Sequence, residues 1–268
     1  MKYVAFLDVL GFKQTLKKLT QNEAEMYISS LSTLLYRTWE DREAQKSKNI
    51  NGYIVSDSII VYTNNDKPSA LIELLDYVLD VSKKAFVEQS VLFRCGIAKG
   101  EFNHLKAHSF ENLQKGLIVG QAYIDAYLLE DQAKVSGIIV DESVANDIRE
   151  HTQHTIEELK GKNDKVCYTL QWANIDLLLD YKNMKNYVEL AQKSDWLPHY
   201  YNTLYLFMSG SNSGNKKTQV FENVIDIISN GDKGQNYKAI DKFIENAFKD
   251  DVESKFKQMF LRYLRGKL

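Results

Sequence analysis

Two aspartates interrupt apolar, strand-like segments, and their type and spacing make them the residues of this chain best suited to chemistry. Asp8 lies in YVAFLDVLGF, a stretch that begins as a strand and ends in a glycine-containing turn. Asp57 lies between YIVS and SIIVYT, at the tip of an expected hairpin. Two carboxylates at one sheet edge repel each other unless a cation neutralises them, and Mg²⁺ and Mn²⁺ prefer oxygen ligands. The pair indicates a divalent-metal site, although an aspartate after a strand is also a common turn residue or helix N-cap.

Strands and helices alternate over the part of the chain that must position these aspartates. Apolar residues at helical spacing predict a long helix within 19–45, and Pro68 marks the first turn of another over 68–89. Strand signals lie in 3–9, 53–63, 91–102, 137–150 and 156–172, and further helix signals follow Gly120 and the strand in 137–150. The order β-α-ββ-α-β-α-β-α-β, with its early hairpin, predicts an α+β sandwich.

The strand signals stop near residue 172. Residues 172–268 have helical periodicity, and SGSNSGNKKTQ (209–219) interrupts it as an expected exposed loop. We therefore predict a helical C-terminal extension or small helical domain. Its aromatic residues are expected to form its own core: Trp196, Tyr200, Tyr201, Tyr205 and Phe207.

The composition is that of an ordinary globular protein, with 44% hydrophobic residues, 26% charged residues and a formal net charge of −2. This charge argues against a dedicated nucleic-acid binder. We expect no signal peptide and no membrane span, because the chain opens on a patterned strand and no apolar run reaches roughly 18 residues. A cytoplasmic location is expected, with Cys95 and Cys167 as buried thiols within apolar segments.

Five segments, in order over about residues 3–171, resemble the signature motifs of class III nucleotidyl cyclases. They are FLDVLGF, VSDSI, RCGIAKGE, VGQAYIDAYLLE and ELKGKNDKVCYTL. The second differs from the family pattern, since Ser56 stands where the family has glycine. The resemblance implies the class III catalytic fold, a ferredoxin-like βαββαβ core with additional elements, over 1–171. Residues 172–268 would then be a helical extension.

The resemblance also implies a site. By position, Asp8, Asp57 and the backbone carbonyl of Val9 would hold two Mn²⁺ or Mg²⁺ ions that activate the ribose 3′-hydroxyl and neutralise the triphosphate. Lys160 and Lys162 would reach phosphate oxygens, although a solvated turn is the plain alternative for both lysines.

Three further positions are implicated near the substrate. The turn at Gly11 and Phe12 could offer backbone amides to a polyphosphate. Arg94 is expected to be structural or an ion-pair partner, with phosphate contact as the lesser possibility.

Two departures from the family pattern affect the chemistry. Ile124 and Leu128 stand where the family has an asparagine and the arginine that stabilises the transition state. Neither side chain donates a hydrogen bond or carries charge. Another cation would have to act, with Lys160, Lys162, Lys99 and Arg94 as the candidates, or catalysis would be weak or absent.

The second departure concerns the base. Tyr53 and Leu117 occupy the positions that read the purine in adenylyl cyclases. With a tyrosine at this position, the chain resembles the pyrimidine cyclases of bacterial Pycsar anti-phage systems, which have a tyrosine in this region. Tyr53 could also be an aromatic residue that packs within its strand. This resemblance implies conversion of UTP, or less favoured CTP, to the 3′,5′-cyclic nucleotide upon infection.

The same resemblance implies partners: a nucleoside triphosphate substrate, a second copy of the chain in a homodimer, and an effector that responds to the cyclic nucleotide. Two alternatives remain open. One is a purine cyclase with an unusual base pocket, and the other is a catalytically silent cyclase-fold module that binds a nucleotide or a partner.

Overall fold

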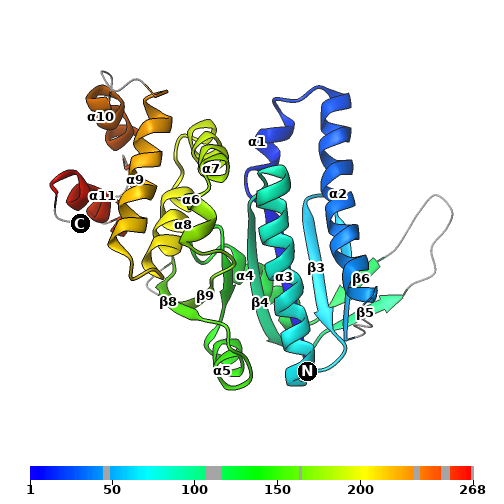
Figure 1. Cartoon of the computed structure of the whole chain (residues 1–268). Helices are drawn as coiled ribbons and strands as arrows, with labels where there is room; N and C mark the ends of the chain where they lie inside the picture. Colours follow the sequence, from blue (N-terminus) through cyan, green and yellow to red (C-terminus); the bar gives the residue numbers. More distant parts are fainter. Residues whose placement is uncertain (45–48, 107–115, 163–164, 232–235, 249–253, 267–268) are drawn as a thin grey trace. The chain divides into compact units, whose positions relative to one another are not determined.

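The chain divides into two compact units, shown in the computed structural model of Figure 1. The first unit comprises residues 1–133 and 137–172, and the second comprises 134–136 and 173–268. The structure describes the following residues: 1–44, 49–106, 116–162, 165–231, 236–248 and 254–266.

A seven-stranded sheet forms the centre of the first unit. Its strands are β1 (Lys2–Val9), β2 (Ile50–Val55), β3 (Ser58–Thr63), β4 (Phe93–Gly100), β7 (Ile138–Val140), β8 (Ile156–Lys160) and β9 (Val166–Leu170). The strand order is β2-β3-β1-β4-β7-β9-β8, and every neighbouring pair is antiparallel except β4 with β7. This mixed sheet confirms the predicted α+β class and both predicted hairpins.

Helices cover both faces of this sheet. They are α1 (Phe12–Leu16), α2 (Gln21–Ala44), α3 (Pro68–Gln89), α4 (Gln121–Glu130) and α5 (Glu142–His151). On β1 the Phe6 ring packs edge-on against Tyr127 of α4 at 5.2 Å, whereas the Tyr3 hydroxyl donates a 2.8 Å hydrogen bond to Asp147 of α5. Side chains alternate across a strand, so α4 and α5 lie on opposite faces. We call the side of the sheet that carries α4 the α4 face.

The helix starts follow their capping residues. Thr20 and Glu23 form a capping box, in which the Thr20 amide donates to Glu23 at 2.8 Å and the Glu23 amide donates to Thr20 at 3.4 Å. Pro68 occupies the first turn of α3 as predicted. The Asp141 carboxylate caps α5 by accepting from the Val144 amide at 2.9 Å.

Three short elements differ from the sequence prediction. Helix α1 was not predicted and begins at Phe12, where the expected turn ends, and β5 (Asn103–Lys106) pairs with β6 (Gly116–Val119) in a separate two-stranded sheet. The segment before Gly120 was expected to be a loop, and that expectation was wrong. Four-residue strands whose backbone pairing alone defines them leave a weak sequence pattern.

The second unit is helical, as predicted, and its helices enclose an aromatic core. They are α6 (Ile175–Leu179), α7 (Tyr181–Lys193), α8 (Pro198–Ser209), α9 (Gly214–Ile228), α10 (Asn236–Ala247) and α11 (Lys255–Leu264). The expected core aromatics Trp196, Tyr200, Tyr201 and Phe207 are buried. Tyr205 is half-buried.

The two cysteines, Cys95 and Cys167, are free and buried, which confirms the prediction for both thiols. Among the described residues, no helix combines the length and apolar character needed to cross a membrane.

Candidate active site

The two aspartates meet at one edge of the sheet. Asp8, near the end of β1, pairs in register with Ser58, the first residue of β3, so Asp57 comes directly beside it. A two-residue turn at Ser56 and Asp57 connects β2 to β3, and Ser56 has a positive φ of 58°. Tight hairpin turns require such left-handed conformations, which explains why the family's glycine is the easier residue here. Sequence reasoning correctly placed both carboxylates on this edge.

The electrostatics of Asp8 reflect this crowding. Burial raises the pKa of Asp8, the ion pair with Arg94 opposes that rise, and the nearby Asp57 carboxylate raises it again. Asp57 is therefore close enough to repel Asp8. Two carboxylates that repel each other are stabilised by a hard divalent cation, which accepts oxygen ligands.

Arg94 joins Asp8 to a third carboxylate that sequence reasoning missed. Its Nη2 lies 2.6 Å from Oδ2 of Asp8, and its Nε lies 2.6 Å from Oε1 of Glu130, an ion contact without hydrogen-bond alignment. Glu130, at the end of α4, is only 5% exposed. Burial raises the pKa of Glu130 to about 7, against the opposing charge of Arg94 and with further upward pressure from Asp8. The sequence signal for this residue was the position of Glu130 directly after the apolar segment AYLL.

The two candidate lysines differ in their contacts, since Lys162 forms an ion pair and Lys160 does not within the described residues. Lys162 pairs with Asp131, just beyond α4, and its charge also lowers the pKa of Glu130. Lys160, at the end of β8, is exposed and makes no side-chain hydrogen bond or ion pair within the described part of the chain. The tip of their hairpin, residues 163–164, lies outside the described residues.

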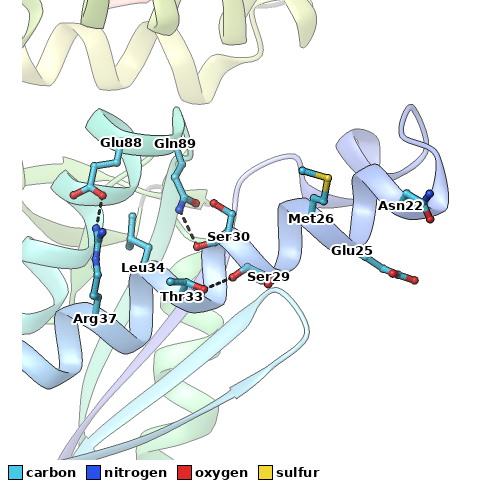
Figure 2. Close-up of a pocket in the computed structure, with 10 residues that line it drawn as sticks. All are labelled: Asn22, Glu25, Met26, Ser29, Ser30, Thr33, Leu34, Arg37, Glu88 and Gln89. Atoms are coloured by element: carbon cyan, nitrogen blue, oxygen red, sulfur yellow. Dashed lines mark hydrogen bonds and ion pairs between the residues drawn. The ribbon is translucent and has the colours of Figure 1, made fainter.

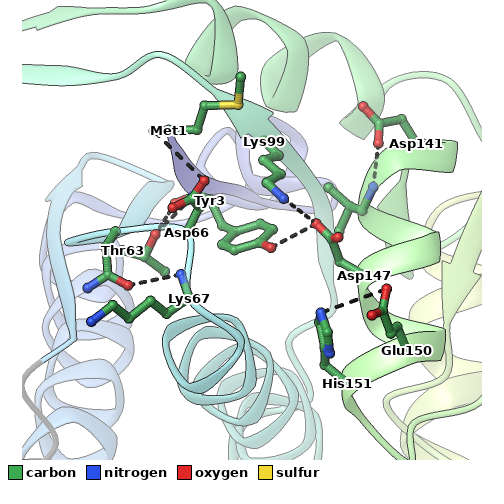
Figure 3. A network of polar contacts seen from close by, with 12 residues as sticks. Met1, Tyr3, Thr63, Asp66, Lys67, Lys99, Asp141, Asp147, Glu150 and His151 are labelled. Carbon is green, nitrogen blue, oxygen red and sulfur yellow. Dashed lines mark hydrogen bonds and ion pairs between the residues drawn. The ribbon is translucent and has the colours of Figure 1, made fainter.

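Lys99 does not belong to this site. Its ammonium pairs with Asp147 of α5 at 2.7 Å and lies 5.2 Å from the centre of the Tyr3 ring, on the face opposite α4 (Figure 3). The hydrogen bond with Asp147 raises the pKa of Lys99 despite some burial. Lys99 is therefore removed from the candidates for the missing cation, because alternation along β4 turns it away from Arg94.

The turn after Asp8 has the expected backbone but a buried side chain. Gly11 has a positive φ of 77°, which favours glycine, and its carbonyl accepts from the Thr15 amide at 3.0 Å. The Phe12 ring is buried and lies 6.1 Å from the Tyr27 ring. Any substrate contact by Phe12 would thus come from its backbone. Val9, the third expected metal ligand, is buried and offers only its carbonyl.

Tyr53 lies on the α4 face, two register rows from Asp8. It pairs with Ile60, which in turn pairs with Phe6. The His104 ring of β5 stacks on the Tyr53 ring with centroids 5.1 Å apart, and burial raises the pKa of Tyr53. Its hydroxyl oxygen is shielded from solvent and has no hydrogen-bond partner among the described residues. The side chain of Leu117 lies outside what the structure describes.

Helix α4 presents an apolar surface where the family has polar groups. Ile124 is 49% exposed and Leu128 is 52% exposed, so both departures lie on the surface of α4. The neighbouring Asp125 accepts a 2.8 Å hydrogen bond from Gln121 of the same helix. Nothing on this helix face replaces the missing positive charge within the described residues.

The acidic edge offers few metal ligands of its own. Within the described ranges, no three His, Cys, Asp or Glu side chains form a metal-binding group. Asp8 and Asp57 supply two carboxylates, and the Val9 carbonyl adds a third oxygen of the kind that Mg²⁺ and Mn²⁺ accept. Mg²⁺ usually keeps water and substrate phosphate among its ligands, so this oxygen set fits a metal that binds together with a triphosphate.

A broad cleft of about 1030 Å³ lies elsewhere, along α2 and the end of α3 (Figure 2). Arg37 and Glu88 form an ion pair across it at 2.5 Å, and Met26 on its wall is 73% exposed. None of the candidate site residues lines it, so its size carries no argument for catalysis.

Solved structures share the fold of the first unit. The adenylyl cyclase CyaB from P. aeruginosa is 13% identical with a TM-score of 0.51, covering 63% of this chain and 93% of that chain. The guanylate cyclase domain of RhGC from Catenaria anguillulae, in complex with GTP, is 14% identical with a TM-score of 0.50, covering 63% and 95%. A bacterial light-regulated adenylyl cyclase is 15% identical with a TM-score of 0.50, covering 64% and 90%.

The sequence matches no family model and no curated protein. The fold assignment therefore depends on the structural similarity. The fold is that of nucleotide cyclase catalytic domains, as the sequence motifs predicted.

Proposed function

We propose that this chain is a divalent-metal-dependent nucleotide cyclase that acts on a pyrimidine nucleoside triphosphate, UTP in preference to CTP. The observation that carries the proposal is the meeting of Asp8 and Asp57 at one edge of a cyclase-type sheet. Burial raises the pKa of Asp8 and the neighbouring Asp57 carboxylate adds to that rise, so the two are costly to keep side by side without a cation, which favours a metal site over a structural role.

The reaction joins the ribose 3′-oxygen to the α-phosphorus and releases pyrophosphate. Asp8, Asp57 and the Val9 carbonyl would hold Mn²⁺ or Mg²⁺, which when bound supplies charge neutralisation and activates the 3′-hydroxyl. The protein's own part is to position the triphosphate and to balance the charge that develops on it. Lys160 is the best candidate for that charge, because it is exposed and unpaired within the described residues, whereas Lys162 pairs with Asp131.

Tyr53 supports a pyrimidine substrate through its size and position. A tyrosine on the α4 face fills space that a two-ring base would need, and its unpaired hydroxyl can hydrogen-bond a base edge. The hydroxyl is shielded in this structure, so the base must displace a neighbouring side chain to reach it. The cyclic product would serve as a second messenger in anti-phage defence and act on a separate effector.

A homodimer completes the proposed site. Apolar residues are exposed on α4, on β6 before it and at the end of β2: Val55, Val119, Ile124, Tyr127 and Leu128. Such a surface fits a second copy of this chain, with the carboxylates of one protomer facing the Tyr53 of its partner.

The test is to incubate the purified protein with Mn²⁺ and each of the four ribonucleoside triphosphates, and to identify products by mass spectrometry. We expect cyclic UMP as the main product. Asp57→Asn should lower the rate at least about a hundredfold, because it removes a metal-binding charge worth several kcal/mol. The exposed carboxylate of Asp41, which pairs with Lys84 on the surface, provides the control variant Asp41→Asn.

One alternative has its own supporting observation. The exposed Ile124 and Leu128, in place of hydrogen-bonding and charged residues, favour a silent module that binds a nucleotide without turning it over. Nucleotide binding with no cyclic product from any triphosphate would establish that alternative. Cyclic AMP or cyclic GMP as the main product would overturn only the choice of a pyrimidine.

A further inference from the structure

Arg94 is shared by two carboxylates that come from different elements. Its guanidinium contacts Asp8 on β1 and Glu130 on α4, at 2.6 Å in each case. The side chains of Arg94 and Asp8 are each 20% exposed, and that of Glu130 is 6% exposed. Water therefore screens these charges poorly, and the guanidinium is the group that neutralises both carboxylates.

A divalent cation on Asp8 would change this arrangement. The guanidinium contacts Oδ2 of Asp8, so a cation on the same carboxylate would share it with Arg94. Two positive centres on one carboxylate repel each other strongly in a partly buried site. This repulsion favours an arrangement in which Arg94 moves away from Asp8, and Glu130 is the partner that remains.

The close approach of α4 to β4 brings Glu130 within reach of Arg94. Gly96, two residues after Arg94 on β4, lies directly under α4, and a Cβ there would stand 2.7 Å from the Glu130 amide nitrogen. The glycine lets the end of α4 descend onto β4, so Glu130 reaches the guanidinium from above the sheet. Asp131, the next residue, points elsewhere and pairs with Lys162.

We propose that Glu130 is a positioning residue that holds the Arg94 guanidinium away from Asp8 when Asp8 binds a divalent cation. This inference rests on the proposed metal role of Asp8. Without the Glu130 charge, Arg94 has only Asp8 as a partner and competes with the cation. Supporting groups of this kind change metal affinity because they set the charge and orientation of the ligand itself.

Mn²⁺ binding in the absence of nucleotide tests the proposal without recourse to activity. Free Mn²⁺ is measured by electron paramagnetic resonance during titration of the wild type, Glu130→Gln, Arg94→Met and the double variant. Glu130→Gln should weaken Mn²⁺ binding about 10- to 100-fold. In the Arg94→Met background the same substitution should change it less than about threefold, because the competitor is gone.

Asp131→Asn is the matched control, since it replaces a carboxylate by an amide one residue away, at a side chain that pairs with Lys162. It should bind Mn²⁺ like the wild type. The proposal would be overturned if Glu130→Gln weakened Mn²⁺ binding equally with and without Arg94. It would also be overturned if Asp131→Asn weakened Mn²⁺ binding as much as Glu130→Gln does, because loss of a nearby charge would then explain both effects. Circular dichroism verifies folding, and Arg94→Gln replaces Arg94→Met in the cycle if that variant does not fold.

The outcomes separate this inference from the proposed function. Mn²⁺ binding that depends on Glu130, in a protein that makes no cyclic nucleotide, would refute the cyclase activity and uphold the role of Glu130. Wild-type protein that binds no Mn²⁺ up to about 10 mM without nucleotide, well above the affinity range of protein divalent-cation sites, would overturn this inference, whereas the cyclase assay with each triphosphate tests the proposed function separately.

Discussion

At the scale of single residues, the site is organised by the cost of burying charge. Arg94 offsets part of that cost for Asp8 and Glu130, and the pKa values of both carboxyl groups are still raised. Functional sites commonly keep such groups although a purely stabilising core would not.

The titration of Glu130 predicts a pH-dependent loss of stability. Burial raises the pKa of Glu130 from 4.5 to about 7, so the folded state holds this proton more tightly than the unfolded state. Its contribution is fully present below the unfolded pKa and is lost as pH rises through the folded pKa. The wild type should therefore lose stability relative to Glu130→Gln between about pH 5 and pH 8, by a few kcal/mol at most at about 1.4 kcal/mol per pKa unit.

Urea denaturation of both proteins at several pH values measures this difference. The Asp8 carboxyl contributes with the same sign in both proteins, so much of its contribution cancels in the difference. Parallel stability curves across this range would contradict the assignment of a neutral-range pKa to Glu130.

Tyr53→Phe is predicted to stabilise the fold and impair the function. The shielded hydroxyl has no partner among the described residues, and an unsatisfied buried hydroxyl costs about 1–3 kcal/mol. Removing it should raise the free energy of unfolding by about 1 kcal/mol while keeping the ring stacked on His104. The preference for UTP over ATP, measured as a ratio of kcat/KM, should fall about tenfold if the hydroxyl reads the base. An unchanged ratio would leave Tyr53 as a packing residue.

At the scale of elements, local signals were sufficient for the longer helices and hairpins. Pro68 and the hairpin tip at Ser56 and Asp57 each marked an element boundary, because capping and turn chemistry depend on neighbouring residues. The motif register also placed Asp57 beside Asp8, as the sheet does.

The parts that sequence reasoning missed depend on contacts between distant residues. The stretches of β5 and β6 have no strong alternation, and their pairing alone defines them. The contact of Arg94 with Glu130 depends on how closely α4 approaches β4, which no local pattern encodes. Lys99 was retained as a candidate cation for the same reason, because its partner Asp147 lies 48 residues away in the sequence.

The approach of α4 predicts a sharp difference between two glycines of β4. A Cβ at Gly96 would stand 2.0 Å from the Ala126 carbonyl oxygen, whereas one at Gly100 would stand 3.4 Å from the nearest atom, the Ala122 amide nitrogen. Gly96→Ala should destabilise the protein by about 3 kcal/mol or more, since backbone has to move. Gly100→Ala should cost less than about 1 kcal/mol. Urea denaturation compares them, and equal losses would refute the proposed tight seat of α4.

At the scale of the whole molecule, the proposed site needs two copies of the chain. The exposed apolar residues on α4 would then serve an interface, which accounts for Ile124 and Leu128 as departures from the family pattern. Leu128→Glu would place a charge in such an interface and should yield a monomer by sedimentation velocity. Met26→Glu alters an even more exposed apolar residue on α2 and should leave the dimer intact.

Mixing two inactive variants gives the strictest test of shared sites. If each site combines the carboxylates of one protomer with the Tyr53 of its partner, an Asp57→Asn and Tyr53→Ala heterodimer contains one site with both lesions and one with neither. Random pairing should then restore about a quarter of wild-type activity per protomer, because half of the dimers are mixed and each has one intact site. Adding Leu128→Glu to both variants should abolish the rescue. No gain on mixing, with exchange of protomers verified by labelled chains, would place the carboxylates and Tyr53 of one protomer in the same site.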